Sequence, residues 1–385
     1  MADNTSLGAA KAAKNDEFYT QYSDIEAEMN AYVEYNPDVF RDKTILLPCD
    51  DPEWSNFTRY FASNFERFGL KKLISTSYAK SSGSKQLTMF ESSSPLFDVQ
   101  KHDTHGKLFT LTRDTDGSGN IDTDDIEFSG YLEGDGDFRS KEVCALRDES
   151  DIIITNPPFS LFREFLAWIM EAGKQFVIIG NQNAITLKEV FPLLKDNKMW
   201  LGYSIHSGDR KFNVPDDYPL LAAGCGIDED GRKYIRVKGV RWFTNIDHGQ
   251  RHEILQLDTM AHNLKYNRKL KKKLLDADMP LEYLTYVNYD SIDVPFTECI
   301  PSDYEGKMGV PITFLDKYNP DQFNILGISL ELAKPMKNVA LKGTYLQGGN
   351  RFYTKALSSS DRENGYLYHR EYDRVVIQAK KGANA

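Results

Sequence analysis

The chain has 385 residues, of which 41% are hydrophobic and 27% are charged. This length lies above the roughly 250–300 residues at which single cores stop growing, so a small cross-linked scaffold is excluded and two domains are expected. The apolar runs are far shorter than the roughly 20 residues of a membrane span, so we expect a soluble protein with no membrane partner. The net charge of −10 at first argues against a phosphate-rich partner, because polyanion binding usually leaves a basic footprint.

Cysteine usage and the N-terminal residues indicate the cellular compartment of the protein. The four cysteines are widely spaced, form no CxxC motif and follow no apolar leader. They are Cys49, Cys144, Cys225 and Cys299. This pattern predicts reduced thiols in the cytoplasm and does not fit a structural zinc site.

The first half of the chain alternates between strands and helices. Residues 1–16 predict a flexible N-terminal arm. Thr44–Leu47 and Lys72–Ser77 predict strands, and the aromatic residues between them recur at helical spacing. After a polar, acidic insertion at about residues 80–135, strands are expected at 151–155, 176–180 and 199–203, with helices at 161–170 and 185–194. This order predicts an α/β fold with a doubly wound, mostly parallel, Rossmann-like sheet.

Two regions follow from this pattern. Residues 17–205 carry the alternation, whereas residues 206–385 consist of short, aromatic, irregular segments that form a second, mixed module. Ligands of a doubly wound sheet bind at the carboxyl ends of its strands. We therefore expect the chemistry in the turns that follow Leu47, Ser75 and Thr155.

The strongest motif is Asn156-Pro157-Pro158-Phe159, directly after a predicted strand and before a helix. Two prolines stiffen the loop, which presents the Asn156 side-chain oxygen and the Pro157 carbonyl as two fixed acceptors. Two acceptors suit an amino group, and holding both of its N–H bonds favours a geometry in which the nitrogen lone pair can attack. Phe159 offers a flat face for a base that has left the duplex. The alternative is an ordinary turn with Phe159 in the core.

Several sequence blocks resemble one known family. The Asn156–Phe159 loop looks like catalytic motif IV of amino-group methyltransferases, and long stretches resemble the EcoRI-type adenine-specific DNA methyltransferases. The matching blocks are NDEFYTQY at 15–22, CDDPEWSNFTRYF at 49–61, residues 69–74, GDGDFRS at 134–140, DIIITNPPFSLFREF at 151–165, residues 189–202 and GKMGVPITFLDKYNPDQF at 306–323. The order of the motifs is similar to the gamma arrangement of such enzymes.

The resemblance implies binding sites for S-adenosylmethionine. Phe18, Tyr19 and Thr20 would lie beside its methionine end, where an aromatic face and a hydroxyl suit a sulfonium and a carboxylate. Pro48, Cys49 and Asp50 occupy the first strand-to-helix turn, although acids and proline stand there in place of the usual glycines. Asp137 and Phe138 would contact the adenine of the cofactor. Ser75 and Thr76 replace the acid that normally binds ribose after the second strand, so that contact must come from elsewhere or be weaker.

The implied activity is methylation of adenine N6 in double-stranded DNA. Residues 17–205 would then be the catalytic domain, with Pro158 completing the catalytic loop, and residues 206–385 would recognise the target. The resemblance also implies a restriction-modification system, a cognate endonuclease and a monomer without a metal cofactor. The alternatives are methylation of RNA adenine or protein glutamine, or a non-catalytic DNA-binding relative.

One acidic loop matches a different pattern. Its residues Asp114, Asp116, Ser118, Asn120 and Asp125 fit the calcium-loop template, with Asp125 in place of the usual Glu. The flanking residues 107–113 and 126–131 alternate like strands instead of forming the helices of an EF-hand. We therefore expect an acidic hairpin loop, in which any calcium ion would be structural.

The charge is unevenly distributed. Residues 111–137 hold nine acids and one base, whereas residues 231–242 and 263–273 hold five and six basic residues and no acid. Phosphate contact and a solvated charged face are both open for these basic segments. The candidates for DNA contact are Lys233, Arg236, Lys238, Arg241, Lys265, Arg268 and Lys269. The acidity is local, and the net charge no longer argues against a nucleic-acid partner.

Overall fold

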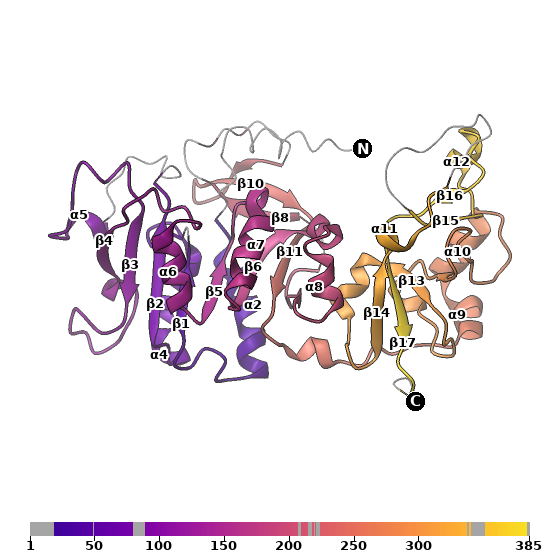
Figure 1. The fold of residues 1–385 in the computed structure, drawn as a ribbon, viewed down its shortest axis with the longest axis horizontal. Helices are drawn as coiled ribbons and strands as arrows, with labels where there is room; N and C mark the ends of the chain where they lie inside the picture. Colours follow the sequence, from indigo (N-terminus) through magenta and orange to yellow (C-terminus); the bar gives the residue numbers. More distant parts are fainter. Residues whose placement is uncertain are drawn as a thin grey trace. The chain divides into compact units, whose positions relative to one another are not determined.

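The computed structural model describes residues 19–48, 50–79, 89–206, 209–214, 218, 220, 224–336, 339 and 351–382. They divide into two compact units (Figure 1). The first unit comprises the described residues up to Gln182 together with Leu201–Gly249, and the second comprises Asn183–Trp200 and the described residues from Gln250 onward. No helix within these ranges combines the length and the apolar character needed to span a membrane.

The first unit is built on one large sheet. Its elements are α2 (Tyr22–Tyr35), β1 (Thr44–Leu47), α3 (Asn56–Ser63), α4 (Phe65–Phe68), β2 (Lys72–Ser77), α5 (Met89–Ser92), β3 (Lys107–Leu111), η1 (Thr123–Asp125), β4 (Glu127–Tyr131), α6 (Lys141–Glu149), β5 (Ile152–Thr155), η2 (Phe159–Leu161), α7 (Phe162–Glu171), β6 (Gln175–Asn181), β8 (Asp209–Asn213), β9 (Gly226–Ile227), β10 (Lys233–Lys238) and β11 (Val240–Thr244). The division falls within β7 (Trp200–Leu201), whose Trp200 is assigned to the second unit and Leu201 to the first.

The sheet is mixed, with a parallel centre. Its order is β4-β3-β2-β1-β5-β6-β11-β7. The four central strands β2, β1, β5 and β6 run parallel, whereas β3 pairs antiparallel with β2 and β4, and β11 pairs antiparallel with β6. From β1 the chain continues to β2 on one side of β1, and it later returns to the other side of β1 as β5. The strand order therefore reverses at β1. This reversal is the point at which such sheets bind ligands.

The central strands are apolar because both faces of the sheet are covered. All four residues of β1 and all four of β5 are buried. Helices α6 and α7 cover one face, and α2 lies on the other, where it contacts α3 (Figure 1). The aromatic spacing that predicts a helix is confirmed in α3, whose Phe57, Tyr60 and Phe61 are buried in the core.

A small sheet lies at the carboxyl end of β6. It has the order β8-β10-β9, and Gly239 alone links β10 to β11. The Gln182 N–H donates to the Gly239 carbonyl (2.5 Å), and Asn181 Nδ2 donates to the Lys238 carbonyl (3.2 Å). Gly239 has a positive φ of 67°, which favours glycine at this turn. The turn therefore holds the small sheet beside the carboxyl edge of the large one.

The second unit contains a smaller sheet and several short helices. Its elements are η3 (Gln182–Thr186), α8 (Phe191–Lys195), η4 (Gly249–His252), α9 (Met260–Tyr266), α10 (Arg268–Asp276), β12 (Ile292–Asp293), η5 (Thr297–Cys299), β13 (Met308–Pro311), η6 (Ile312–Lys317), β14 (Phe323–Ile328), α11 (Ser329–Leu332), β15 (Tyr353–Thr354), α12 (Ser359–Glu363), β16 (His369–Arg370) and β17 (Arg374–Ala379). The sheet order is β12-β13-β17-β14, and β15 pairs with β16.

The expected α/β class is confirmed, and some elements differ in extent. The helix expected at residues 185–194 is the 3-10 segment η3 followed by the short α8, with Pro192 in its first turn. The sequence pattern predicts a boundary near residue 205, whereas β11 pairs with β6 and belongs to the first unit. Non-local strand pairing of this kind leaves no local signal in the sequence.

Candidate active site

The Asn156–Phe159 loop begins directly after β5, beside β1 at the reversal point of the sheet. Pro157 is buried, and the Asn156 side-chain oxygen is shielded from solvent. The Leu161 N–H donates to the Pro158 carbonyl (2.9 Å), which starts the 3-10 turn η2. Among the described residues, the Pro157 carbonyl takes part in none of the hydrogen bonds of this turn. The loop can therefore present two oxygen acceptors.

Phe159 and Phe162 anchor the loop on the sheet. Phe159 is half-buried and packs against the main core. Phe162 is buried against the ring of Phe243, with 5.0 Å between the centroids. It also contacts Gly180 of β6 so closely that a Cβ at this glycine would collide with the ring. Gly180 therefore lets α7 begin close to the sheet, immediately after the loop.

Asp50 ties the turn after β1 to the end of β5. Its carboxylate accepts hydrogen bonds from the hydroxyl of Thr155 (2.6 Å) and from the hydroxyl of Ser55 (2.7 Å). The Thr155 hydroxyl also lies 3.0 Å from the Pro48 carbonyl. Burial raises the pKa of the Asp50 carboxyl to about 7, although the hydrogen bonds from Thr155 and Ser55 lower it. Because Thr155 directly precedes Asn156, this contact fixes the start of the Asn156–Phe159 loop.

This network is the part of the site that sequence reasoning missed. Asp50 is predicted as a cofactor contact, but both of its carboxylate oxygens are bonded to protein hydroxyls. Its carbonyl accepts hydrogen bonds from Thr58 (3.0 Å) and from Ser75 of β2. One of these residues had a local signal, because Ser55 caps the N-terminus of α3. Thr58 lies in the same helix, whereas Thr155 and Ser75 come from the separate strands β5 and β2.

The N-terminal segment lies at the start of α3. Tyr19 pairs with Asn213 of β8, with N–H to carbonyl distances of 2.9 and 3.0 Å. Asn56, the first residue of α3, donates to the Thr20 carbonyl (2.7 Å). Thr20 is only 3% exposed, and its hydroxyl has no hydrogen-bond partner among the described residues. Phe18 and Cys49, which are predicted cofactor contacts, lie outside the described residues.

The loop that contains Asp137 and Phe138 lies over the carboxyl end of β2. The Ala79 N–H donates to the Asp135 carbonyl (2.8 Å), and a Cβ at Gly136 would collide with the Ser77 carbonyl. Phe138 is buried, with its ring centroid 5.0 Å from that of Phe165 and 5.6 Å from that of Trp168. The Asp137 carboxylate accepts two bonds from the Arg139 guanidinium, at 2.9 and 2.6 Å.

A buried ion pair lies at the same end of β2. Lys107 pairs in register with Ser77, and its ammonium group lies 2.6 Å from the Glu91 carboxylate. Burial alone would raise the pKa of Glu91, but hydrogen bonds from Lys107, Tyr131 and His102 lower it below its ordinary value. This pair was not predicted, because α5 and β3 supply its members and no motif links them.

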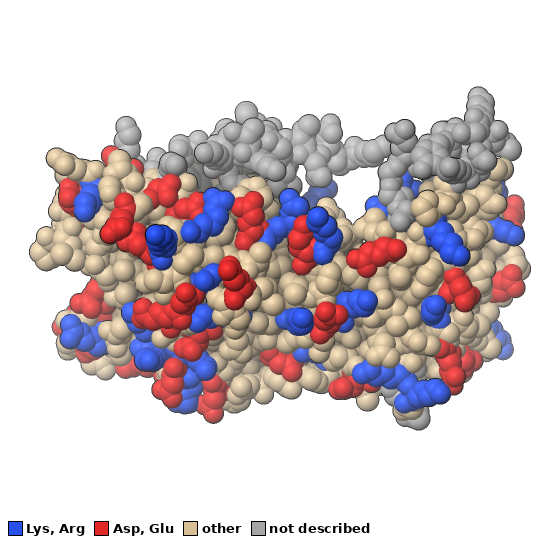
Figure 2. Space-filling model, viewed as in Figure 1, with Lys and Arg blue, Asp and Glu red and all other residues tan. Residues whose placement is uncertain are grey.

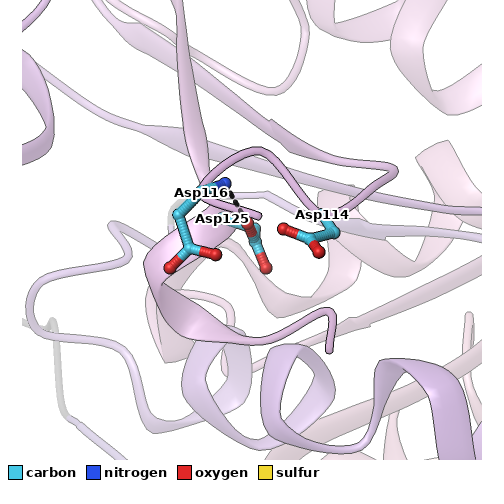
Figure 3. A group of neighbouring side chains, drawn as sticks. All are labelled: Asp114, Asp116 and Asp125. Carbon is cyan, nitrogen blue, oxygen red and sulfur yellow. Dashed lines mark hydrogen bonds between the residues drawn. The ribbon is translucent and has the colours of Figure 1, made fainter. Parts of the chain in front are cut away.

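The acidic loop joins the antiparallel strands β3 and β4, so the expected hairpin is confirmed. The carboxylates of Asp114, Asp116 and Asp125 gather on one side of the loop, with ligand atoms within 4.8 Å of one another (Figure 3). Backbone N–H groups of Gly117 and Gly119 donate to Asp114 at 2.6 and 2.8 Å. These bonds lower the pKa of Asp114 and stabilise the loop. The alternative of a calcium ion in this loop, in which Ser118 and Asn120 would share, stays untested.

The basic residues that are predicted to contact DNA differ in their exposure to solvent. Arg236 and Lys238 lie on the exposed face of β10, whereas Arg241 of β11 is 2% exposed. The burial of Arg241 argues against its predicted phosphate contact. Lys233 is half-buried and donates to the Tyr218 carbonyl (3.2 Å). On the face drawn in Figure 2, acidic and basic side chains are interspersed.

The fold and this loop define an α/β enzyme with an amino-group methyltransferase motif at the reversal point of its sheet. The family described as "Adenine-specific methyltransferase EcoRI" matches residues 6–380. The chain therefore belongs to this family and is an adenine-specific DNA methyltransferase.

Individual relatives agree with this assignment. The chain is 42% identical over 325 residues to the Type II methyltransferase M.EcoRI of Escherichia coli, which covers 84% of this chain and 89% of the relative. It is 32% identical over 319 residues to M.MpnI of Mycoplasma pneumoniae, and this alignment covers 82% of this chain and 83% of the relative. It is 31% identical over 374 residues to M.MgeORF184P of Mycoplasma genitalium, and this alignment covers 97% of this chain and 98% of the relative. No solved structure matches the chain.

Proposed function

We propose that this enzyme transfers a methyl group from S-adenosylmethionine to N6 of an adenine that is flipped out of duplex DNA. The observation that carries the proposal is the place of the Asn156–Phe159 loop, at the carboxyl end of β5 and tied through Thr155 and Asp50 to the turn after β1. We include a cognate restriction endonuclease and a monomeric enzyme in the proposal, as the family resemblance implies.

The residues around the first turn fit the cofactor. The buried Thr20 hydroxyl suits the cofactor's carboxylate, and the adjacent Tyr19 offers an aromatic ring for the sulfonium. The loop that carries Asp137 and Phe138 lies at the end of β2, where the nucleoside part of the cofactor would bind. When bound, the cofactor supplies an electrophilic methyl group on its sulfonium.

The catalytic loop orients the target amino group. The Asn156 side-chain oxygen and the Pro157 carbonyl accept its two N–H bonds, which turns the nitrogen lone pair toward the methyl donor. Pro157 and Pro158 restrict the loop to one conformation, so the acceptors need no reorganisation during the reaction. Phe159 stacks on the flipped base, as enzymes that modify bases require.

DNA contacts in the first unit come from the small sheet. Arg236 and Lys238 have no acidic partner among the described residues, and their strand lies next to the carboxyl edge of β6. Their positive charges can therefore contact phosphates near the extruded base. Lys211 on the neighbouring strand is already paired with Asp228, at 3.4 Å.

Methyl transfer from labelled S-adenosylmethionine tests this proposal. Purified protein is incubated separately with duplex DNA, RNA and a glutamine-containing protein extract, and the labelled product is identified by mass spectrometry. We expect label in DNA alone, as N6-methyladenine. Label in RNA or protein but not in DNA would contradict the proposal, as would a failure of the protein to bind the cofactor in calorimetry.

A further inference from the structure

Helix α10 of the second unit is unusually basic, and two of its three leucines are buried and fix its orientation. Leu270 and Leu274 are 1% and 2% exposed and hold one face of the helix against the core. The Asn267 side chain accepts the Leu270 N–H (3.0 Å) and caps the first turn. The positions of the basic side chains around this helix are therefore set by its packing.

Two of these cations are neutralised within the protein. The Lys269 ammonium group lies 2.8 Å from the Glu298 carboxylate. Lys273 reaches the buried carboxylates of Asp293 (3.3 Å) and Glu371 (3.4 Å), which also bind Arg374. The Lys273 pair attaches α10 to β12 and the Lys269 pair attaches it to η5, so the charges of both lysines are compensated within the protein.

The remaining cations share one groove. Lys265 of α9 and Arg268, Lys271 and Lys272 of α10 line a groove of about 470 Å³, together with Tyr266, Leu275 and one acid, Asp276. None of these four cations forms an ion pair with a described acidic residue. Tyr266 and Leu275 are 57% and 59% exposed, so the groove also offers an apolar surface.

This arrangement does not help the helix to fold. Arg268 stands in the first turn of α10, where a positive charge opposes the helix dipole. Arg268 and Lys272 are four residues apart, a spacing at which like charges repel. Because the cations cost local stability and have no acidic partner, they fit a polyanion that binds from outside.

We infer that this groove binds the sugar-phosphate backbone of duplex DNA, an inference that rests on the proposed function. Lys271 and Lys272, with Arg268 and Lys265, contact phosphates, while Tyr266 and Leu275 pack against sugars. Such contacts hold the duplex without reading its sequence. Lys269, which the sequence pattern includes among the DNA contacts, is left out because it does not line the groove and its charge is paired with Glu298.

Matched substitutions on one helix test this assignment. Lys271→Gln and Lys272→Gln each remove a groove cation, and Lys269→Gln removes a paired cation from the same helix. Binding of the full-length protein to a labelled duplex of random sequence is measured across a range of NaCl concentrations. At about 150 mM salt, we expect each groove variant to bind roughly fivefold more weakly, with a salt slope lower by about 0.9.

The double variant and a rescue sharpen the result. Lys271→Gln combined with Lys272→Gln should weaken binding roughly thirtyfold and lower the slope by about 1.8, because each lost phosphate contact contributes separately. Lys272→Arg keeps the charge and should bind like the wild type. Groove variants that fold normally and match Lys269→Gln in affinity and slope would overturn the inference.

The activity of the wild type separates the two possible failures. If the wild type methylates duplex DNA but the groove variants bind like Lys269→Gln, only the groove assignment is wrong. If the wild type does not methylate DNA, the proposed function itself fails.

Discussion

The carboxyl edge of the large sheet and helix α10 handle polar groups in opposite ways. At the edge, Asp50 is buried, and hydroxyls from α3 and β5 fix its carboxylate. On α10, Lys271 and Lys272 face a groove and pair with no described acid. Rigid, buried bonds suit chemistry, which depends on orientation, whereas exposed charges suit binding to a long polyanion. Changes at the edge should therefore alter rate and stability, and changes on α10 should alter affinity and its salt dependence.

The largest effect is expected at Asn156. Asn156→Ala removes one of the two acceptors for the amino group, and loss of one oriented group in an active site costs about 10²- to 10³-fold in rate. Single-turnover transfer of labelled methyl to DNA measures this loss. Cofactor binding by calorimetry serves as the control and should stay unchanged. A near-wild-type rate would refute the assigned role.

Removal of the Asp50 carboxylate should weaken the fold itself. Asp50→Ala leaves the buried Ser55 hydroxyl without its acceptor, at about 1–3 kcal/mol, and leaves the Thr155 hydroxyl with the Pro48 carbonyl alone. We expect the free energy of unfolding in urea to fall by about 1–3 kcal/mol. Asp50→Asn, which keeps an acceptor oxygen, should lose less. Equal stability of the wild type and Asp50→Ala would show that the network does not hold the edge together.

The pH dependence of stability should reveal the burial of Asp50. Its pKa is raised from 3.8 to about 7 in the folded state, so between these values the folded protein holds a proton that the unfolded chain has lost. The free energy of unfolding should therefore fall as the pH rises, by about 1.4 kcal/mol per unit, and level off above pH 7. Asp50→Asn lacks this contribution, so the difference between the two proteins isolates it. A difference that does not change with pH would be inconsistent with a buried acid.

The smallest effect is expected at the small sheet. Arg236→Gln removes one exposed cation, and loss of a single phosphate contact should weaken DNA binding roughly fivefold at about 150 mM salt. Fluorescence anisotropy with a duplex measures the change. Lys211→Gln is the matched control, because Lys211 is already paired with Asp228. An equal loss in both variants would mean that β10 makes no specific contact.

Local patterns predicted much of the first unit. Buried runs gave β1, β2 and β5 in the right places, and the Asn-Pro-Pro-Phe loop lies at the carboxyl edge as expected. The helix expected at 185–194 is shorter, because Pro192 limits α8. The alternation in β10 could not reveal that its continuation, β11, inserts into the large sheet and buries Arg241.

The polar networks could not be predicted, because their members are distant in sequence. Asp50 and Thr155 lie on separate strands, and nothing local indicates that they bond. Glu298 likewise neutralises Lys269 from a separate 3-10 turn, which the count of basic residues ignores. Composition located the basic segments, but the three-dimensional partners decide which charges stay available for DNA.

Modified-base sequencing of genomic DNA tests the central claim most directly. The protein is expressed in cells that lack other adenine methyltransferases, with Asn156→Ala as the control. We predict N6-methyladenine at one recurring sequence for the wild type and a strongly reduced level of this mark for Asn156→Ala. Unmodified adenine with the wild type, methylation of cytosine, or equal marks with both proteins would contradict the claim that the Asn156–Phe159 loop methylates adenine in DNA.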